Sequence, residues 1–153
     1  MGTGDLKMEG LAGRKIPRIL VVDDTEAIRE VLSKILSFMG YEVVVASSGN
    51  EGLNRFLKHS FELVLTDFDM PGIDGCTLAL RIKDKSPNTP VVLLTGSEEE
   101  VVMERLKGGC VDYVMLKPFL LEDIEEIVHR IIDEKPSGSG SPPLAEAPLY
   151  TLP

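Results

Sequence analysis

Short apolar segments alternate with segments of helical period along most of this chain, and this alternation constrains the fold more than any other feature. The apolar segments are rich in Val, Ile and Leu and are too short for buried helices, so each is predicted to be a buried strand. They lie at residues 18–24, 41–46, 61–67, 90–96 and 111–117. Between and after them, apolar residues recur every three or four positions and predict helices at about residues 28–39, 50–60, 74–85, 98–108 and 120–135.

Five strands alternating with five helices predict an α/β fold with one parallel sheet and helices on both of its faces. We expect a single domain over residues 16–135. The Gly-containing segment 1–15 and the Pro/Gly/Ser-rich segment 136–153 are expected to be tails, and the second could also be a linker. In sheets of this kind the functional site lies beyond the carboxyl ends of the strands, where the strand order reverses.

Charge and composition exclude several classes of protein. The chain of 153 residues has a net charge of −9 and a pI of about 4.7, which disfavours direct binding to nucleic acid or to an anionic membrane. No apolar run approaches the roughly 20 residues of a membrane span, and the first residues lack the apolar core of a secretory signal. We therefore expect a cytoplasmic protein whose two cysteines, Cys76 and Cys110, are free thiols, because they form no CxxC or metal-ligand spacing.

Chemically distinctive residues stand at the predicted strand ends. The first strand ends in Asp23 and Asp24, the third in Asp67, the fourth in Thr95 and the fifth in Lys117. Because the carboxyl ends of parallel strands meet at one edge of the sheet, these side chains are predicted to converge there. Asp24 is also a candidate N-cap for the first helix.

The charges at this edge favour a divalent cation. Three carboxylates against one lysine would raise carboxylate pKa values by like-charge repulsion unless a cation were present. Oxygen ligands with places left for water suit Mg²⁺, or Mn²⁺ in its place. A carboxylate surrounded by a metal, a lysine and a hydroxyl favours phosphoryl transfer, with Asp67 as the nucleophile and Thr95 and Lys117 as its helpers.

Four motifs resemble those of a known family. "ILVVDD", "LVLTDFDMPGIDG", "VVLLTG" and "LKPF" occur in the order and at the spacing of bacterial response-regulator receiver domains. The resemblance covers about residues 16–135. It implies the flavodoxin-like (βα)₅ fold, a doubly wound five-stranded parallel sheet in a single domain.

The resemblance also assigns the site residues. It implies that Asp67 is the phosphoacceptor, that Thr95 is the switch hydroxyl and that Lys117 pairs with the phosphoryl group. Asp23, Asp24 and Asp67 would hold Mg²⁺ together with the main-chain carbonyl of Asp69. The peptide bond between Lys117 and Pro118 would be cis, as in similar proteins.

The implied activity is that of a signalling switch and not of an enzyme with a separate substrate. The domain would accept phosphate from the phosphohistidine of a sensor histidine kinase or a histidine phosphotransfer protein. Phosphorylation would then repack the surface formed by the fourth helix, fifth strand and fifth helix. The partner that reads this change would be a downstream effector protein or a missing output domain, so the chain either acts alone or is the receiver of a longer protein.

Two positions depart from the family pattern. Receivers usually carry an aromatic residue three positions before the lysine, where this chain has Val114, and Tyr113 lies one position earlier. Either a bulge brings Tyr113 into the aromatic role or the switch lacks an aromatic side chain, and we favour the second interpretation. Thr25 replaces the acid that often follows the acidic pair, which is expected to leave metal binding intact.

Two other functions are compatible with parts of the pattern. "DFDMP" offers Asp67 and Asp69 to the DxDx[TV] nucleophile motif of haloacid-dehalogenase-type phosphatases, but Pro71 stands where Thr or Val belongs. A receiver used only as an unphosphorylated scaffold is the other alternative, and the intact set of acids and lysine disfavours it. His59 and His129 are expected to lie on solvated helix surfaces.

Overall fold

The computed structural model describes residues 15–96, 103–104, 106 and 109–133. The predicted tails and most of the helix expected at 98–108 lie outside the described residues. Five parallel strands form one sheet: β1 Arg18–Val22, β2 Glu42–Ala46, β3 Leu63–Asp67, β4 Val91–Thr95 and β5 Tyr113–Leu116. Each strand is shorter than predicted, although flanking residues such as Asp23 and Lys117 still donate main-chain hydrogen bonds to the neighbouring strand.

The sheet has the strand order β2-β1-β3-β4-β5. The chain passes from β1 outward to β2 and then returns to the other side of β1, so the order reverses between β1 and β3. The register pairs Val22 with Thr66 across these two central strands. This topology and the helices on both faces confirm the predicted doubly wound α/β fold.

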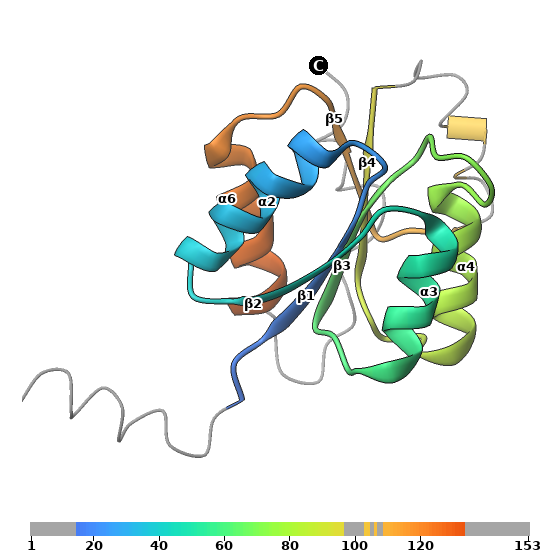
Figure 1. Ribbon diagram of the computed structural model, residues 1–153, viewed down its shortest axis with the longest axis horizontal. Helices are drawn as coiled ribbons and strands as arrows, with labels where there is room; N and C mark the ends of the chain where they lie inside the picture. The colour runs from blue at the N-terminus through green and yellow to red at the C-terminus, as the bar shows by residue number, and fades with distance from the viewer. Residues whose placement is uncertain (1–14, 97–102, 105, 107–108, 134–153) are drawn as a thin grey trace, which may run out of the picture.

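Helices cover both faces of the sheet (Figure 1). Helix α2 Glu26–Phe38 and helix α6 Leu121–Val128 pack on one face, and α3 Gly49–Lys58 and α4 Gly75–Lys85 pack on the other. The predicted last helix is divided, because a π-helical segment, η1 His129–Asp133, continues from α6. His59 and His129 are exposed, as predicted.

The core is aliphatic and lies in two layers, one on each side of the sheet. Alternate residues of every strand enter opposite layers, so Leu20 and Val22 contact the α3/α4 side while Ile19 and Val21 contact the α2/α6 side. Burial on both faces explains why β1, β3, β4 and β5 are nearly continuous apolar runs, whereas the edge strand β2 is only partly buried.

Local signals set the helix boundaries. Asp74 caps α4 by accepting a hydrogen bond from the Thr77 main-chain nitrogen at 2.8 Å, and Ser48 caps α3 in the same way. Gly40, with φ of +100°, follows the end of α2 as predicted. The suggestion that Asp24 caps α2 is wrong, because Thr25 occupies the N-cap position and its side chain makes no capping hydrogen bond.

The prediction that the cysteines are free thiols is also wrong. Cys76 in the first turn of α4 forms a disulfide with Cys110, which lies just before β5, and both side chains are buried in the α3/α4 layer. The two residues are 34 positions apart in the sequence. Their pairing depends on the packing of α4 beside the chain entering β5, which no local spacing rule detects. Lys83 and Asp112 form an ion pair between the same two segments.

No helix in the described part of the chain is long and apolar enough to span a membrane.

Candidate phosphoryl-transfer site

The candidate site lies where the strand order reverses. Asp67 is the last residue of β3, and Asp23 directly follows β1. Because Val22 pairs with Thr66, the next residues of the two strands, Asp23 and Asp67, lie side by side. Asp23 is 0% exposed and Asp67 is 6% exposed, so both carboxylates are removed from water.

Lys117 joins these two carboxylates. Its ammonium donates a hydrogen bond of 3.0 Å to Asp23 Oδ2 and another of 3.0 Å to Asp67 Oδ1. The main-chain nitrogen of Lys117 also donates to the Thr95 carbonyl oxygen at 2.8 Å, which extends the β4–β5 ladder by one residue. The side chain of Lys117 therefore reaches past the end of β4 to the acids of β1 and β3. The peptide bond to Pro118 is cis, as the family resemblance implied.

Burial and neighbouring charges set the protonation of this group. Burial is the main factor that raises the pKa of Asp67, from 3.8 to about 6. The carboxylates of Asp23 and Asp24 raise it further, while Lys117 opposes the shift. Burial alone would lower the pKa of Lys117, but its hydrogen bonds to the two acids outweigh this effect and the pKa is raised. The lysine is therefore charged at neutral pH.

The three acids can supply one metal site. One carboxylate oxygen from each of Asp23, Asp24 and Asp67 lies within 4.8 Å of the others, although Asp24 is exposed. An all-oxygen donor set with one solvent-facing ligand suits a hard divalent cation that keeps several waters. One lysine does not balance three carboxylates, so the arrangement fits a cation on electrostatic grounds as well.

Two contacts that we did not predict hold Asp23 in place. The Arg29 guanidinium on α2 donates to the main-chain oxygen of Asp23 at 2.7 Å, and the Thr25 main-chain nitrogen donates to Asp23 Oδ1 at 2.9 Å. The first turns of α2 therefore orient the acidic pair. Arg29 lies five residues after Asp24, and nothing in one sequence distinguishes it from other helix-surface arginines.

The loop between β3 and α4 is closely packed against Asp67. The Phe68 nitrogen donates to the Leu94 oxygen at 2.8 Å, and the Gly75 nitrogen donates to the Phe68 oxygen at 2.9 Å. A Cβ atom at Gly75 would overlap the main-chain oxygen of Asp67. Gly72 has φ of +83°, which favours glycine in the Pro-Gly turn. Asp69 is exposed, and the role of its carbonyl as a metal ligand stays a prediction.

Thr95 lies at the end of β4, next to the acid-bearing strand, and is 0% exposed. The β4–β5 register is regular from the pair of Val92 and Tyr113 to the pair of Thr95 and Leu116, so β5 contains no bulge. Tyr113 therefore enters the α2/α6 layer, whereas Val114 enters the α3/α4 layer. Because Val114 pairs with Leu93, two residues before Thr95, it shares the face of Thr95. The geometry agrees with a switch that lacks an aromatic side chain.

Comparison with known proteins gives a consistent result. The family profile described as "Response regulator receiver domain" matches residues 19–129. The regulatory protein AtoC of Escherichia coli is 36% identical over 118 residues, which are 76% of this chain and 25% of AtoC. The chain spans between a quarter and about half of the length of the curated relatives that it matches first.

Solved structures of high similarity are receiver domains as well. A CheY-like receiver domain from Methanospirillum hungatei has a TM-score of 0.74 and 30% identity, over 78% of this chain and 96% of that chain. The response regulator TrrA of Thermotoga maritima, solved in complex with Mg²⁺ and BeF, has a TM-score of 0.70 and 33% identity. That match covers 76% of this chain and 100% of TrrA.

Proposed function

Because the chain belongs to the response regulator receiver family of two-component systems, we propose that it is a phosphorylation switch with Asp67 as the phosphoacceptor. The observation that supports this most directly is the hydrogen bond of 3.0 Å between Lys117 and Asp67 beside the other two acids. Membership of the receiver family supports this function over the haloacid-dehalogenase-type phosphatase alternative.

The proposed reaction transfers a phosphoryl group from a phosphohistidine to Asp67. An oxygen of the Asp67 carboxylate forms a bond to phosphorus while the phosphorus–nitrogen bond breaks, and the leaving imidazole nitrogen keeps the electron pair and takes up a proton. With a pKa of about 6, Asp67 is mostly ionised and nucleophilic at neutral pH. Lys117 remains charged and offsets the negative charge of the incoming group.

Asp23, Asp24 and Asp67 would hold a divalent cation, with the Asp69 carbonyl as a further expected ligand. Mg²⁺, or Mn²⁺ in its place, would supply positive charge next to the phosphoryl oxygens. The acid cluster and the Mg²⁺ complex of TrrA support this assignment. Arg29 and the Thr25 nitrogen keep Asp23 oriented for it.

Thr95 is the residue that we assign to read the phosphoryl group. Its position at the end of β4 suits donation of its hydroxyl proton to a phosphoryl oxygen. Movement of Thr95 toward the site would change the packing of Val114, which lies on the same face of the sheet. Val114 is smaller and stiffer than the aromatic side chain that most receivers have at this position. The signal would then travel through repacking of β5 and its neighbours.

The partners follow from the same proposal. A sensor histidine kinase or histidine phosphotransfer protein would donate the phosphate, and an effector protein or an output domain of a longer protein would read the result. The net charge of −9 leaves any contact with DNA to such a partner. We expect the protein to act in the cytoplasm, where such kinases present their phosphohistidines.

Treatment with acetyl phosphate or phosphoramidate tests the assignment. With Mg²⁺, intact-mass spectrometry should show one phosphoryl group per chain, and chelation of Mg²⁺ should prevent it. Asp67→Asn should abolish labelling, whereas the matched variant Asp69→Asn, which changes a nearby exposed acid, should still be labelled. Persistent labelling of Asp67→Asn would reject Asp67 as the acceptor. If the wild type neither binds Mg²⁺ nor becomes labelled, the result would favour the alternative of an unphosphorylated scaffold.

A further inference from the structure

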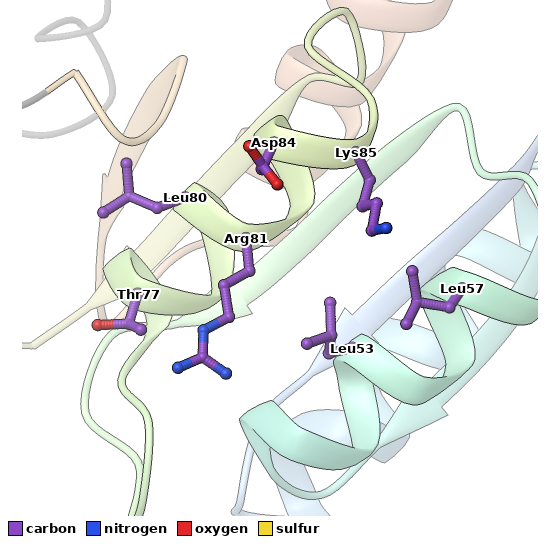
Figure 2. A pocket seen from close by; sticks show the side chains of 7 residues that line it. All are labelled: Leu53, Leu57, Thr77, Leu80, Arg81, Asp84 and Lys85. Atoms are coloured by element: carbon purple, nitrogen blue, oxygen red, sulfur yellow. The ribbon is translucent and has the colours of Figure 1, made fainter.

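A groove lies between α3 and α4 (Figure 2), on the face of the sheet opposite to α2 and α6 (Figure 1). Its volume is about 510 Å³. The α3 side presents Leu53 and Leu57, and the α4 side presents Leu80, Arg81 and Lys85. The groove is separate from the acid cluster at the strand ends.

The groove exposes apolar surface that the fold does not use. Leu57 is 54% exposed and Leu80 is 49% exposed. Other residues of the two helices fill the core, so these two leucines are not needed there. Leu53 and Leu57 are four positions apart, so they form one continuous apolar stripe along α3. Burial of such side chains against a partner is favourable because it removes apolar surface from water.

The same groove carries uncompensated positive charge. Arg81 and Lys85 are also four positions apart and extend along the edge of α4 that faces α3 (Figure 2). Neither forms an ion pair within the described residues, whereas the neighbouring Lys83 and Arg55 are paired with Asp112 and Glu51. Among the described residues, Asp84 is the single acid that lines the groove. The groove therefore has a net positive charge, whereas the chain as a whole has a net charge of −9.

We propose that this groove binds an acidic amphipathic helix of a partner protein. The apolar face of such a helix would cover Leu57 and Leu80, and its Glu or Asp residues would pair with Arg81 and Lys85. Binding of a helix in a groove between two helices uses anchors at positions i, i+3, i+4 and i+7.

Charge favours this occupant over two others. A second copy of the chain also carries −9, so its approach is opposed by long-range repulsion. The segment 136–153 of the chain itself contains a single acidic side chain, Glu146, so it offers less negative charge than the two cations can pair with. The proposal does not depend on phosphorylation of Asp67, although α4 begins directly against that residue through Gly75.

The test uses a fluorescent synthetic helix of about four turns with Leu at the anchor positions and Glu on the flanking positions. The full chain without any phosphodonor should bind it with a micromolar Kd in fluorescence polarisation. The same peptide with Lys in place of each Glu, and a scrambled peptide, should bind about tenfold more weakly or not at all.

Matched variants of the protein locate the binding site. Arg81→Glu and Leu57→Ala should each weaken binding about tenfold, whereas Lys34→Glu, the same charge change at an exposed position of α2, should change it less than twofold. Circular dichroism should show that all variants remain folded. Equal affinity of Arg81→Glu and Lys34→Glu, or no preference for the acidic peptide, would overturn the proposal.

Two further outcomes would assign the groove to a different occupant and so also overturn it. One is stronger peptide binding after Leu149→Asp and Leu152→Asp, which would show that the tail fills the groove. The other is a concentration-dependent dimer in sedimentation that Arg81→Glu dissociates. Because no phosphodonor is present, Asp67→Asn should bind the peptide like the wild type, so failure of the switch function is distinguished from failure of this proposal.

Discussion

Lys117 and Asp67 are 50 residues apart in the chain, yet the lysine ammonium lies 3.0 Å from the aspartate carboxylate. The same ammonium contacts Asp23, which directly follows β1. Three segments that are not adjacent in the sequence therefore meet at the Lys117 ammonium. The consequences of this arrangement for stability and metal binding can be measured in the protein.

Lys117→Met should destabilise the metal-free protein at pH 7. The change leaves two buried carboxylates without their cation, and removal of one partner from a buried ion pair costs about 3–5 kcal/mol. Urea unfolding should show a loss in this range, and the loss should shrink at low pH as the carboxylates become protonated. Lys85→Met, at an exposed lysine that forms no ion pair within the described residues, should change the free energy of unfolding by less than about 0.5 kcal/mol. Similar losses in the two variants would contradict the ion-pair account.

Asp67→Asn should stabilise the metal-free protein above pH 6. The folded-state pKa of Asp67 is about 6, above its ordinary value of 3.8, so the folded state holds this proton more tightly than the unfolded state. The stability from this group is full below pH 3.8 and is lost as the pH rises through 6. The variant should therefore gain up to about 3 kcal/mol over the wild type at pH 8 and lose this advantage below pH 4. Urea unfolding of both proteins across this range tests it; a difference that does not change with pH would contradict the raised pKa.

Mg²⁺ should raise the melting temperature of the wild type in a concentration-dependent way. A ligand that binds only the folded state stabilises it by RT ln(1 + [L]/Kd), which is about 2.7 kcal/mol when the concentration is 100 times Kd. Asp23→Asn should remove most of this gain, because it neutralises a fully buried carboxylate of the proposed metal site. Asp133 lies on η1 and is not part of the acid cluster, so Asp133→Asn should retain the gain. An equal response of the two variants to Mg²⁺ would place the cation elsewhere.

Reduction of the Cys76–Cys110 disulfide should lower the free energy of unfolding. The bond spans 34 residues, and the chain-entropy estimate for a loop of that size is about 3–4 kcal/mol. Urea unfolding with and without a thiol reductant measures the difference. The double variant Cys76→Ala with Cys110→Ala should be destabilised from the start and insensitive to reductant. If the reductant does not change the free energy of unfolding of the wild type, the result would contradict a stabilising disulfide.

Gly75→Ala should destabilise the domain through overpacking against the Asp67 main chain. The new Cβ would overlap the Asp67 main-chain oxygen and lie 2.8 Å from Leu93 Cδ1, and forced overpacking typically costs about 1–3 kcal/mol. Gly96→Ala is a matched control, because its Cβ would meet only Lys117 Cβ, at 3.9 Å, among the neighbours within 4 Å that the structure describes. Thermal unfolding should separate the two variants by several degrees, and equal melting temperatures would contradict the close packing.

The candidate site was predictable to the extent that each residue follows a strand. The register confirms that Asp23 and Asp67 are neighbours, and the short contacts of Lys117 to both confirm the predicted convergence of those three side chains. Arg29 was not predictable, because its contact with the Asp23 carbonyl depends on the angle at which α2 leaves β1. The cysteines were wrongly predicted to be free thiols for a similar reason, since a spacing of 34 residues carries no local signal for their disulfide.

By itself, the sequence determined the number and type of the strands and which chemical groups stand at their carboxyl ends. These properties depend on hydrophobic period and on the order of residues along the chain, which are local. The tertiary structure alone decided that Lys117 reaches both acids, that Tyr113 and Val114 enter opposite layers and that Cys76 meets Cys110. It also placed Leu53 and Leu57 of α3 beside Arg81 and Lys85 of α4. Each of these relationships joins segments far apart in the chain, so it depends on strand order and helix packing and not on any local pattern.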